Sequence, residues 1–174
     1  MKRKPRDIDV LAQSLRQRTL PTEHIEQFRA RIGELEAAAR PGTPMSASAR
    51  DLMIVARQLE ELARRSHGAP VDPDLISALP PSVKDRIDTR LANAAKRLAA
   101  RAETAAAAAT PRTAEPSKVE RTVDPAFRCA EDYKSCMATA HTTSEKIWCN
   151  LAMIVCLART IIPQVIPAPK KTGG

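Results

Sequence analysis

The four cysteines limit the fold of this chain more than any other feature. All of them lie in one short C-terminal segment, as Cys129, Cys136, Cys149 and Cys156. Within each successive pair the spacing is seven residues, nearly two turns of α-helix, so both members of a pair lie on one helix face. Thr142 and Glu145 have the spacing of a capping box, which starts a second helix just after a short turn. The pattern therefore predicts an antiparallel helical hairpin over residues 128–162.

An antiparallel hairpin brings the inner cysteines together and the outer cysteines together. It predicts two nested disulfides, Cys136–Cys149 and Cys129–Cys156. A disulfide joins Cα atoms about 5.5–6 Å apart, whereas packed helices usually lie about 8–10 Å apart, so small neighbouring side chains are needed. The segment supplies Ala130, Ala140 and Ala152. Four cysteines allow three pairings, and the preference among them rests on the hairpin geometry.

The same cysteines have three other interpretations. They could be free thiols, buried as small apolar side chains. They could bind zinc together with the nearby His141, although zinc-binding cysteines usually lie about two to four residues apart. Redox catalysis favours a Cys-x-x-Cys motif at the start of a helix, which this sequence lacks. We expect the disulfides, with no metal and no cofactor.

The paired spacing and the hydroxyl-rich turn His141-Thr142-Thr143-Ser144 resemble the nested-disulfide helical hairpin of the glycocin bacteriocins. In that family the loop between the helices carries the glycosylated residue. The resemblance therefore implies a modification site among Thr142, Thr143 and Ser144. Glycocin leaders end in a double glycine, whereas the only Gly-Gly of this chain is Gly173-Gly174. The segment also resembles, more loosely, the twin-cysteine helical hairpins of the mitochondrial intermembrane space.

The rest of the chain is predicted to be helical as well. Aromatic residues make up only 2% of the sequence and there are five glycines, so a β fold is disfavoured. Fourteen prolines divide the chain into short helices and connections. Periodic apolar residues predict helices near 8–18, 23–38, 48–66 and 82–109. The expected fold is all-α, with a small N-terminal bundle or coiled-coil-like helices, a proline-containing linker and the C-terminal hairpin.

A change of composition suggests that the hairpin is a compact unit of its own. Residues 1–109 form the basic helical region, 110–127 the linker, 128–162 the hairpin and 163–174 a disordered tail. Three of the four aromatic residues accompany the cysteines, as Phe127, Tyr133 and Trp148. Nearly all the aromatic mass and all the sulfur therefore lie beyond the linker.

Two narrow apolar stripes lie in the N-terminal region. The first comprises Ile25, Phe28, Ile32 and Leu35, and the second comprises Leu52, Val55, Leu59 and Leu62. Ser48 and Asp51 resemble a capping box at the start of the second helix. Two such helices and an alanine-rich third helix bury little area, so we expect a homo-oligomer or a protein partner along these stripes. The competing possibility is a three-helix bundle closed by Ser82–Arg101.

The net charge of +8 favours anionic partners such as nucleic acid. The basic residues that we expect to contact phosphates without reading sequence are Lys2, Arg3, Lys4, Arg6, Lys84, Arg86, Arg90, Lys96 and Arg97. Aromatic side chains for base stacking are nearly absent from this region. The interspersed acids Asp85 and Asp88 dilute the cationic face.

No motif of an enzyme is found: there is no phosphate-binding glycine loop, no zinc-binding His-Glu helix and no nucleophile elbow. The most apolar stretch, Ile147–Ile166, contains Asn150, Arg159 and Pro163, so we expect no membrane span. The basic N-terminus lacks the apolar run of a Sec signal peptide.

We therefore expect a non-enzymatic protein whose hairpin is a secreted effector or recognition module. The N-terminal helices would act as an interaction or delivery region, and export would use a route without a Sec signal peptide. The alternative is a cytoplasmic protein with reduced cysteines that binds nucleic acid or another protein.

Overall fold

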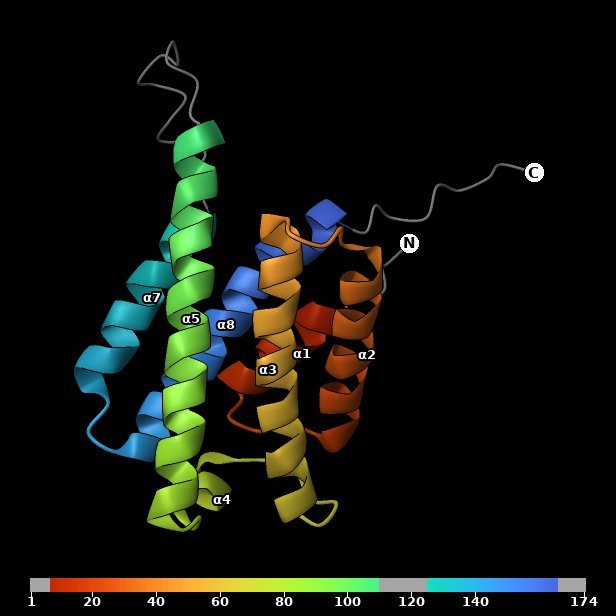
Figure 1. The fold of residues 1–174 in the computed structure, drawn as a ribbon. Helices are drawn as coiled ribbons and strands as arrows, with labels where there is room; N and C mark the ends of the chain where they lie inside the picture. The colour runs from red at the N-terminus through yellow and green to blue at the C-terminus, as the bar shows by residue number, and fades with distance from the viewer. Residues whose placement is uncertain (1–6, 110–124, 166–174) are drawn as a thin grey trace, which may run out of the picture.

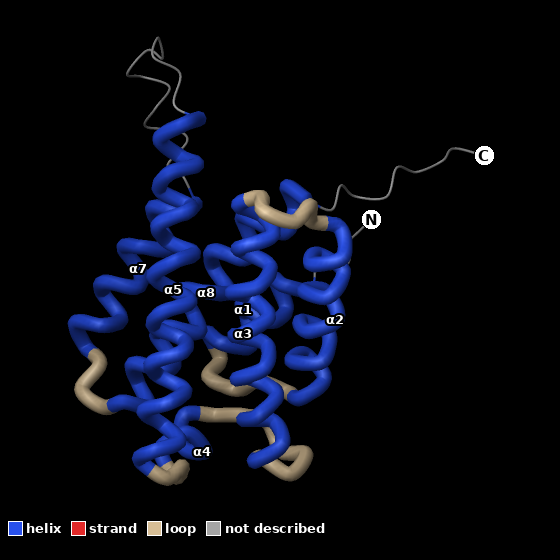
Figure 2. Tube along the Cα trace, viewed as in Figure 1, coloured by secondary structure: helices blue, strands red, loops and turns tan. Residues whose placement is uncertain are grey.

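The computed structural model describes residues 7–109 and 125–165, and these are all-α, as predicted. The helices are α1 (Asp7–Arg16), α2 (Thr22–Ala38), α3 (Pro44–Arg65), α4 (Pro73–Ser77), α5 (Pro81–Ala109), α7 (Pro125–Thr139) and α8 (Thr143–Val165). Short loops join most of them (Figure 2). The only β pairing in the described part is an isolated bridge between Leu20 and Val71, which ties the loop after α1 to the loop before α4.

The helices form two layers. Helices α2, α3 and α5 lie side by side in one layer, and α1, α8 and α7 form the other (Figure 1). Helix α8 contacts each of the other described helices, including the short α4. The second helix of the predicted hairpin is therefore the central helix of the whole bundle.

The sequence of α8 explains its central position. Ile147, Leu151 and Ile154 are fully buried at helical spacing, and Trp148 and Val155 are buried on an adjoining face. A helix that is apolar around most of its circumference must be covered on several sides. The neighbouring helices provide this cover, so α8 is buried in the protein interior.

The expectation that the hairpin is a compact unit of its own is wrong. Its apolar side chains join Leu52, Leu59 and Leu91 of α3 and α5 in one continuous hydrophobic cluster. The physical reason is that α8 has more apolar surface than α7 alone covers, so it also packs on α1, α3 and α5. Residues on both sides of the linker therefore share one core.

The two N-terminal stripes are covered within a single chain. Ile25, Phe28, Ile32 and Leu35 are at most 2% exposed, and Leu52, Val55, Leu59 and Leu62 are at most 1% exposed. No apolar seam therefore remains along them for a second copy. The expected pairing with a second copy is therefore corrected: α2 and α3 pack on each other, α5 packs along α3 as in the competing three-helix arrangement, and α8 of the same chain adds further cover.

Several helix ends agree with the sequence, whereas the start of α3 does not. Helix α3 begins at Pro44, where the Thr43 hydroxyl accepts a hydrogen bond from the Ser46 amide at 3.2 Å. Ser48 and Asp51, expected to cap this helix, lie inside it. At the other end of α3, His67 and Gly68 adopt positive φ angles of 50° and 88°, a conformation that glycine allows without strain.

Two predicted boundaries shift, and some segments lie outside the described residues. Helix α7 includes 125–127, which were assigned to the linker, and α8 includes 163–165, which were assigned to the tail. The basic arm 1–6, most of the linker (110–124) and 166–174 are not described.

Asp51 connects the two long helices of the first layer. Its carboxylate forms ion pairs with Arg97, at 2.8 Å, and with Arg101 of α5. Arg101 also donates a hydrogen bond to the Ser48 hydroxyl at 3.0 Å. Ser48 and Asp51 are both buried, so these bonds satisfy polar groups at the interface of α3 and α5.

Candidate functional site

Helices α7 and α8 are joined by both disulfides. Cys129 is bonded to Cys156 and Cys136 to Cys149, with a Cα–Cα distance of 5.7 Å in each case. These are the nested pairs that the antiparallel hairpin predicts. Of the three alanines, Ala130 directly follows Cys129 and Ala152 lies on α8 between Cys149 and Cys156, whereas Ala140 lies in the turn after α7. No cysteine in the described residues is free.

The turn of the hairpin is stabilised by a complete capping box. The Glu145 amide donates to the Thr142 hydroxyl at 3.2 Å, and the Glu145 carboxylate accepts from the amides of His141 and Thr142. These backbone donors, chiefly that of His141, lower the pKa of Glu145. The turn therefore begins α8 and directs it antiparallel to α7.

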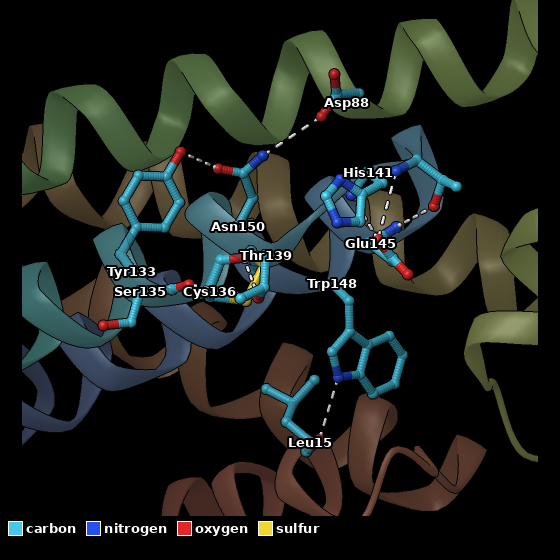
Figure 3. Close-up of a disulfide and its surroundings, with 12 residues drawn as sticks. Leu15, Asp88, Tyr133, Ser135, Cys136, Thr139, His141, Glu145, Trp148 and Asn150 are labelled. Carbon is cyan, nitrogen blue, oxygen red and sulfur yellow. Dashed lines mark hydrogen bonds between the residues drawn. A yellow bond between two sulfur atoms is a disulfide. The ribbon is translucent and has the colours of Figure 1, made fainter.

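Two successive side-chain hydrogen bonds link α7 to α8 and α8 to α5 (Figure 3). The Tyr133 hydroxyl donates to Asn150 Oδ1 at 2.9 Å, and Asn150 Nδ2 donates to Asp88 Oδ1 at 3.4 Å. Asn150 is 1% exposed, so both bonds satisfy an amide that water does not reach. Burial raises the pKa of Asp88, and burial together with the Asp88 charge raises the pKa of Tyr133. These two hydrogen bonds give α7 a specific noncovalent contact with the bundle.

Helix α1 is held against the other side of α8. Trp148 Nε1 donates to the backbone carbonyl of Leu15 at 3.1 Å, as Figure 3 shows, and Arg159 forms an ion pair with Asp9 at 2.8 Å. Trp148 is 6% exposed. These contacts place α1 along α8, opposite α7.

Between α1 and α7 the surface contains a groove of about 330 Å³, which we call the disulfide groove. All four cysteines line it, together with Trp148, Ala152 and Met153 of α8. Arg16, Arg18 and Arg159 also line it, of which Arg159 is paired with Asp9, and the carboxylate of the lining is that of Asp132. The groove therefore combines an apolar floor with a rim on which positive charge predominates.

The residues that the glycocin resemblance marks for modification differ in accessibility. Ser144 is 4% exposed and accepts a hydrogen bond from the Ser77 hydroxyl of α4 at 2.9 Å. A sugar on Ser144 would displace α4. Thr142 is exposed and Thr143 is half-buried, so only these two hydroxyl residues have space for a bulky group.

The predicted cationic face of α5 is partly neutralised. Arg86 pairs with Glu61 at 2.7 Å, and Arg97 pairs with Asp51. The Lys84 ammonium donates to the Ser77 carbonyl at 3.3 Å. Of this face, Arg90 and Lys96 are exposed and have no acidic partner among the described residues. Lys2, Arg3, Lys4 and Arg6 lie outside the described residues. The structure does not bring the five α5 cations together as one free patch.

Sequence reasoning missed the disulfide groove. Its two walls, α1 and α7, are separated by more than a hundred residues, and neither helix carries a binding motif. The residue that could have indicated a contact between the hairpin and another helix is Trp148, the only tryptophan in an aromatic-poor chain. Such a residue usually packs against more than its own hairpin, because its large ring needs extensive cover.

Comparison with known protein families, curated proteins and solved structures gave no match to this chain. Across residues 7–109 and 125–165, no helix has the length and apolar character needed to cross a membrane. The same part of the chain contains no group of His, Cys, Asp or Glu residues that could hold a metal ion. The disulfide groove is thus the feature from which we infer a function.

Proposed function

We propose that this protein is a non-enzymatic helical recognition module that acts outside the reducing cytoplasm. The observation that carries the proposal is the disulfide groove, an apolar floor with an arginine-rich rim. Two disulfides hold one of its walls, and disulfides persist in oxidising compartments. The groove offers no paired acid and base for a reaction, which supports binding over catalysis.

The partner that best fits this groove is an amphipathic helix with acidic flanks. Helices bind in grooves through apolar side chains on one face, while charges beside the groove set orientation and specificity. The floor beside Trp148 and Ala152 suits small or medium apolar side chains. Arg16 and Arg18 would attract carboxylates next to them.

The position of α8 favours a recognition module over a released, bacteriocin-like effector. Release of the hairpin would expose Ile147, Leu151 and Ile154 to water and would leave the leucines of α3 and α5 uncovered. Burial of each such side chain contributes about 1.5–3 kcal/mol. The hairpin then resembles glycocins in its nested disulfide pairing, but it acts as part of the whole protein and is not released as a separate peptide.

The oxidised state is tested on protein from its native source. Intact mass spectrometry should show a gain of four hydrogen atoms on reduction, two for each disulfide. Alkylation before reduction should leave the mass unchanged. Four thiols that react without reduction would contradict the proposed site of action.

The groove is tested with synthetic peptides and the fluorescence of Trp148, which is the only tryptophan. The probe is a helical peptide with leucines on one face and glutamates elsewhere; its control carries lysines in place of the glutamates. We expect saturable binding of the acidic peptide to the oxidised full chain, with a Kd of about 1–100 µM, and much weaker binding of the basic peptide.

Two matched variants locate the binding. Ala152→Glu adds bulk and negative charge to the exposed floor and should weaken binding at least about tenfold. Ala138→Glu adds the same residue at an exposed position of α7 outside the groove, and it should change the Kd by less than about twofold. Equal binding of both peptides, or an unaffected Ala152→Glu variant, would contradict the groove as the recognition site.

A further inference from the structure

Helix α7 differs from the rest of the bundle in how it is held. Among its described side chains, from Arg128 onward, only Cys129 is buried, and Ala130, Tyr133, Cys136 and Met137 are half-buried. The shorter α1 buries Ile8, Leu11 and Leu15, and even the short α4 buries Ile76. No large aliphatic side chain described in α7 enters the core. Its attachment therefore depends mainly on the two disulfides and on Tyr133, which donates to Asn150 and, with Ala130, packs against the edge of the core.

We infer that reduction of the two disulfides releases α7 and leaves the other helices folded, so that α7 is a redox-controlled wall of the disulfide groove. An isolated helix of fifteen residues is marginal in water. The core of α1–α5 and α8 contains the fully buried leucines and isoleucines, and none of these comes from the described side chains of α7. Local opening of a weakly anchored element, without global unfolding, is the expected response.

The bonds can be reached by a dithiol reductant, because all four cysteines line the groove and Cys136 and Cys156 are half-buried. A thiolate of the reductant attacks Cys136 Sγ, the bond to Cys149 breaks, and the Cys149 thiolate takes up a proton. The second thiol of the reductant then displaces Cys136 and closes the reductant's own disulfide. The same exchange at Cys156 frees Cys129. Each bridge gains two electrons and two protons, and each dithiol loses them.

Release would remove the wall formed by Cys129, Asp132 and Tyr133 and expose Cys149, Asn150 and Cys156 on α8. The consequence for binding rests on the proposed function, whereas the release of α7 does not. The two proposals can therefore fail separately. Binding of the acidic peptide tests the function of the groove, and amide hydrogen exchange tests the release of α7.

The test is hydrogen exchange on the oxidised full chain, with and without an excess of dithiol, with complete reduction checked by mass. All four cysteines are in the bridges, so the reductant has no other target. Protection of α7 amides should fall by about two orders of magnitude, while amides of α3, α5 and α8 beside Leu59, Leu91 and Leu151 keep theirs within about threefold. The same amount of the reductant in its oxidised form is the control.

A variant in which serine replaces Cys129, Cys136, Cys149 and Cys156 should reproduce the exchange pattern of the reduced protein. An α7 that stays protected after full reduction would overturn the inference. Loss of protection throughout α3, α5 and α8, in either the reduced protein or the serine variant, would overturn it equally, because α7 would then be required for the whole fold.

Discussion

Leu59→Asp is expected to unfold the monomer. Leu59 is 1% exposed and packs among Leu52, Val55 and Leu62 in the shared core. A carboxylate buried among these apolar side chains costs several kcal/mol, which approaches the total stability of about 5–15 kcal/mol for a protein of this size. Circular dichroism should show loss of helix at 25 °C, and sedimentation should show an expanded monomer.

Arg57→Asp on the exposed face of α3 is the matched control for Leu59→Asp. It introduces the same side chain two residues away, where water solvates it, and should leave the helix content unchanged. If the wild-type protein is a dimer and Leu59→Asp yields a folded monomer, the stripe is an interface between copies and its burial within one chain is wrong.

Ile154→Ala is expected to lower the free energy of unfolding by about 2–5 kcal/mol and to shift the melting of every helix together. Ile154 is fully buried in α8 and belongs to the same hydrophobic cluster as residues of α3 and α5. A cavity at this site therefore weakens both sides of the linker. Chemical denaturation should show one cooperative transition, displaced to lower denaturant, when helix content and Trp148 fluorescence are compared.

Lys146→Ala, at an exposed position of the same helix, should change the unfolding free energy by less than about 0.5 kcal/mol. The informative comparison is between the two probes in Ile154→Ala. If the fluorescence transition moves while the N-terminal helices melt as in the wild type, the hairpin and the N-terminal region are separate units, and the shared core is contradicted.

The two helices of the hairpin have different positions in the bundle. A hairpin that is closed by disulfides usually has little core of its own. Here one helix of the hairpin is the centre of the bundle, and the other is attached to its outer side by covalent bonds. Helix α8 holds the core and also lines the floor of the groove, and α7 forms one wall of it.

The sequence by itself determined the features that depend on neighbouring residues. Gly68 follows the end of α3 and Pro73 begins α4, because glycine and proline free or restrict their own backbone. The capping box of Thr142 and Glu145 and the nested cysteine pairs follow in the same way from spacings within a helix and a short turn. The helices and the hairpin could therefore be predicted from the sequence alone.

Only the tertiary structure decided what covers each apolar face. The stripe through Leu52 and Leu59 indicates burial, but the same stripe fits a second copy, a third helix or α8, because the hydrophobic effect has no direction. The hydrogen bond from Trp148 to Leu15 joins residues 133 positions apart, and the ion pairs of Asp51 turn an expected cap into a contact between helices. The disulfide groove exists because α1 and α7 meet the same helix from opposite sides, and no local pattern in the chain encodes that meeting.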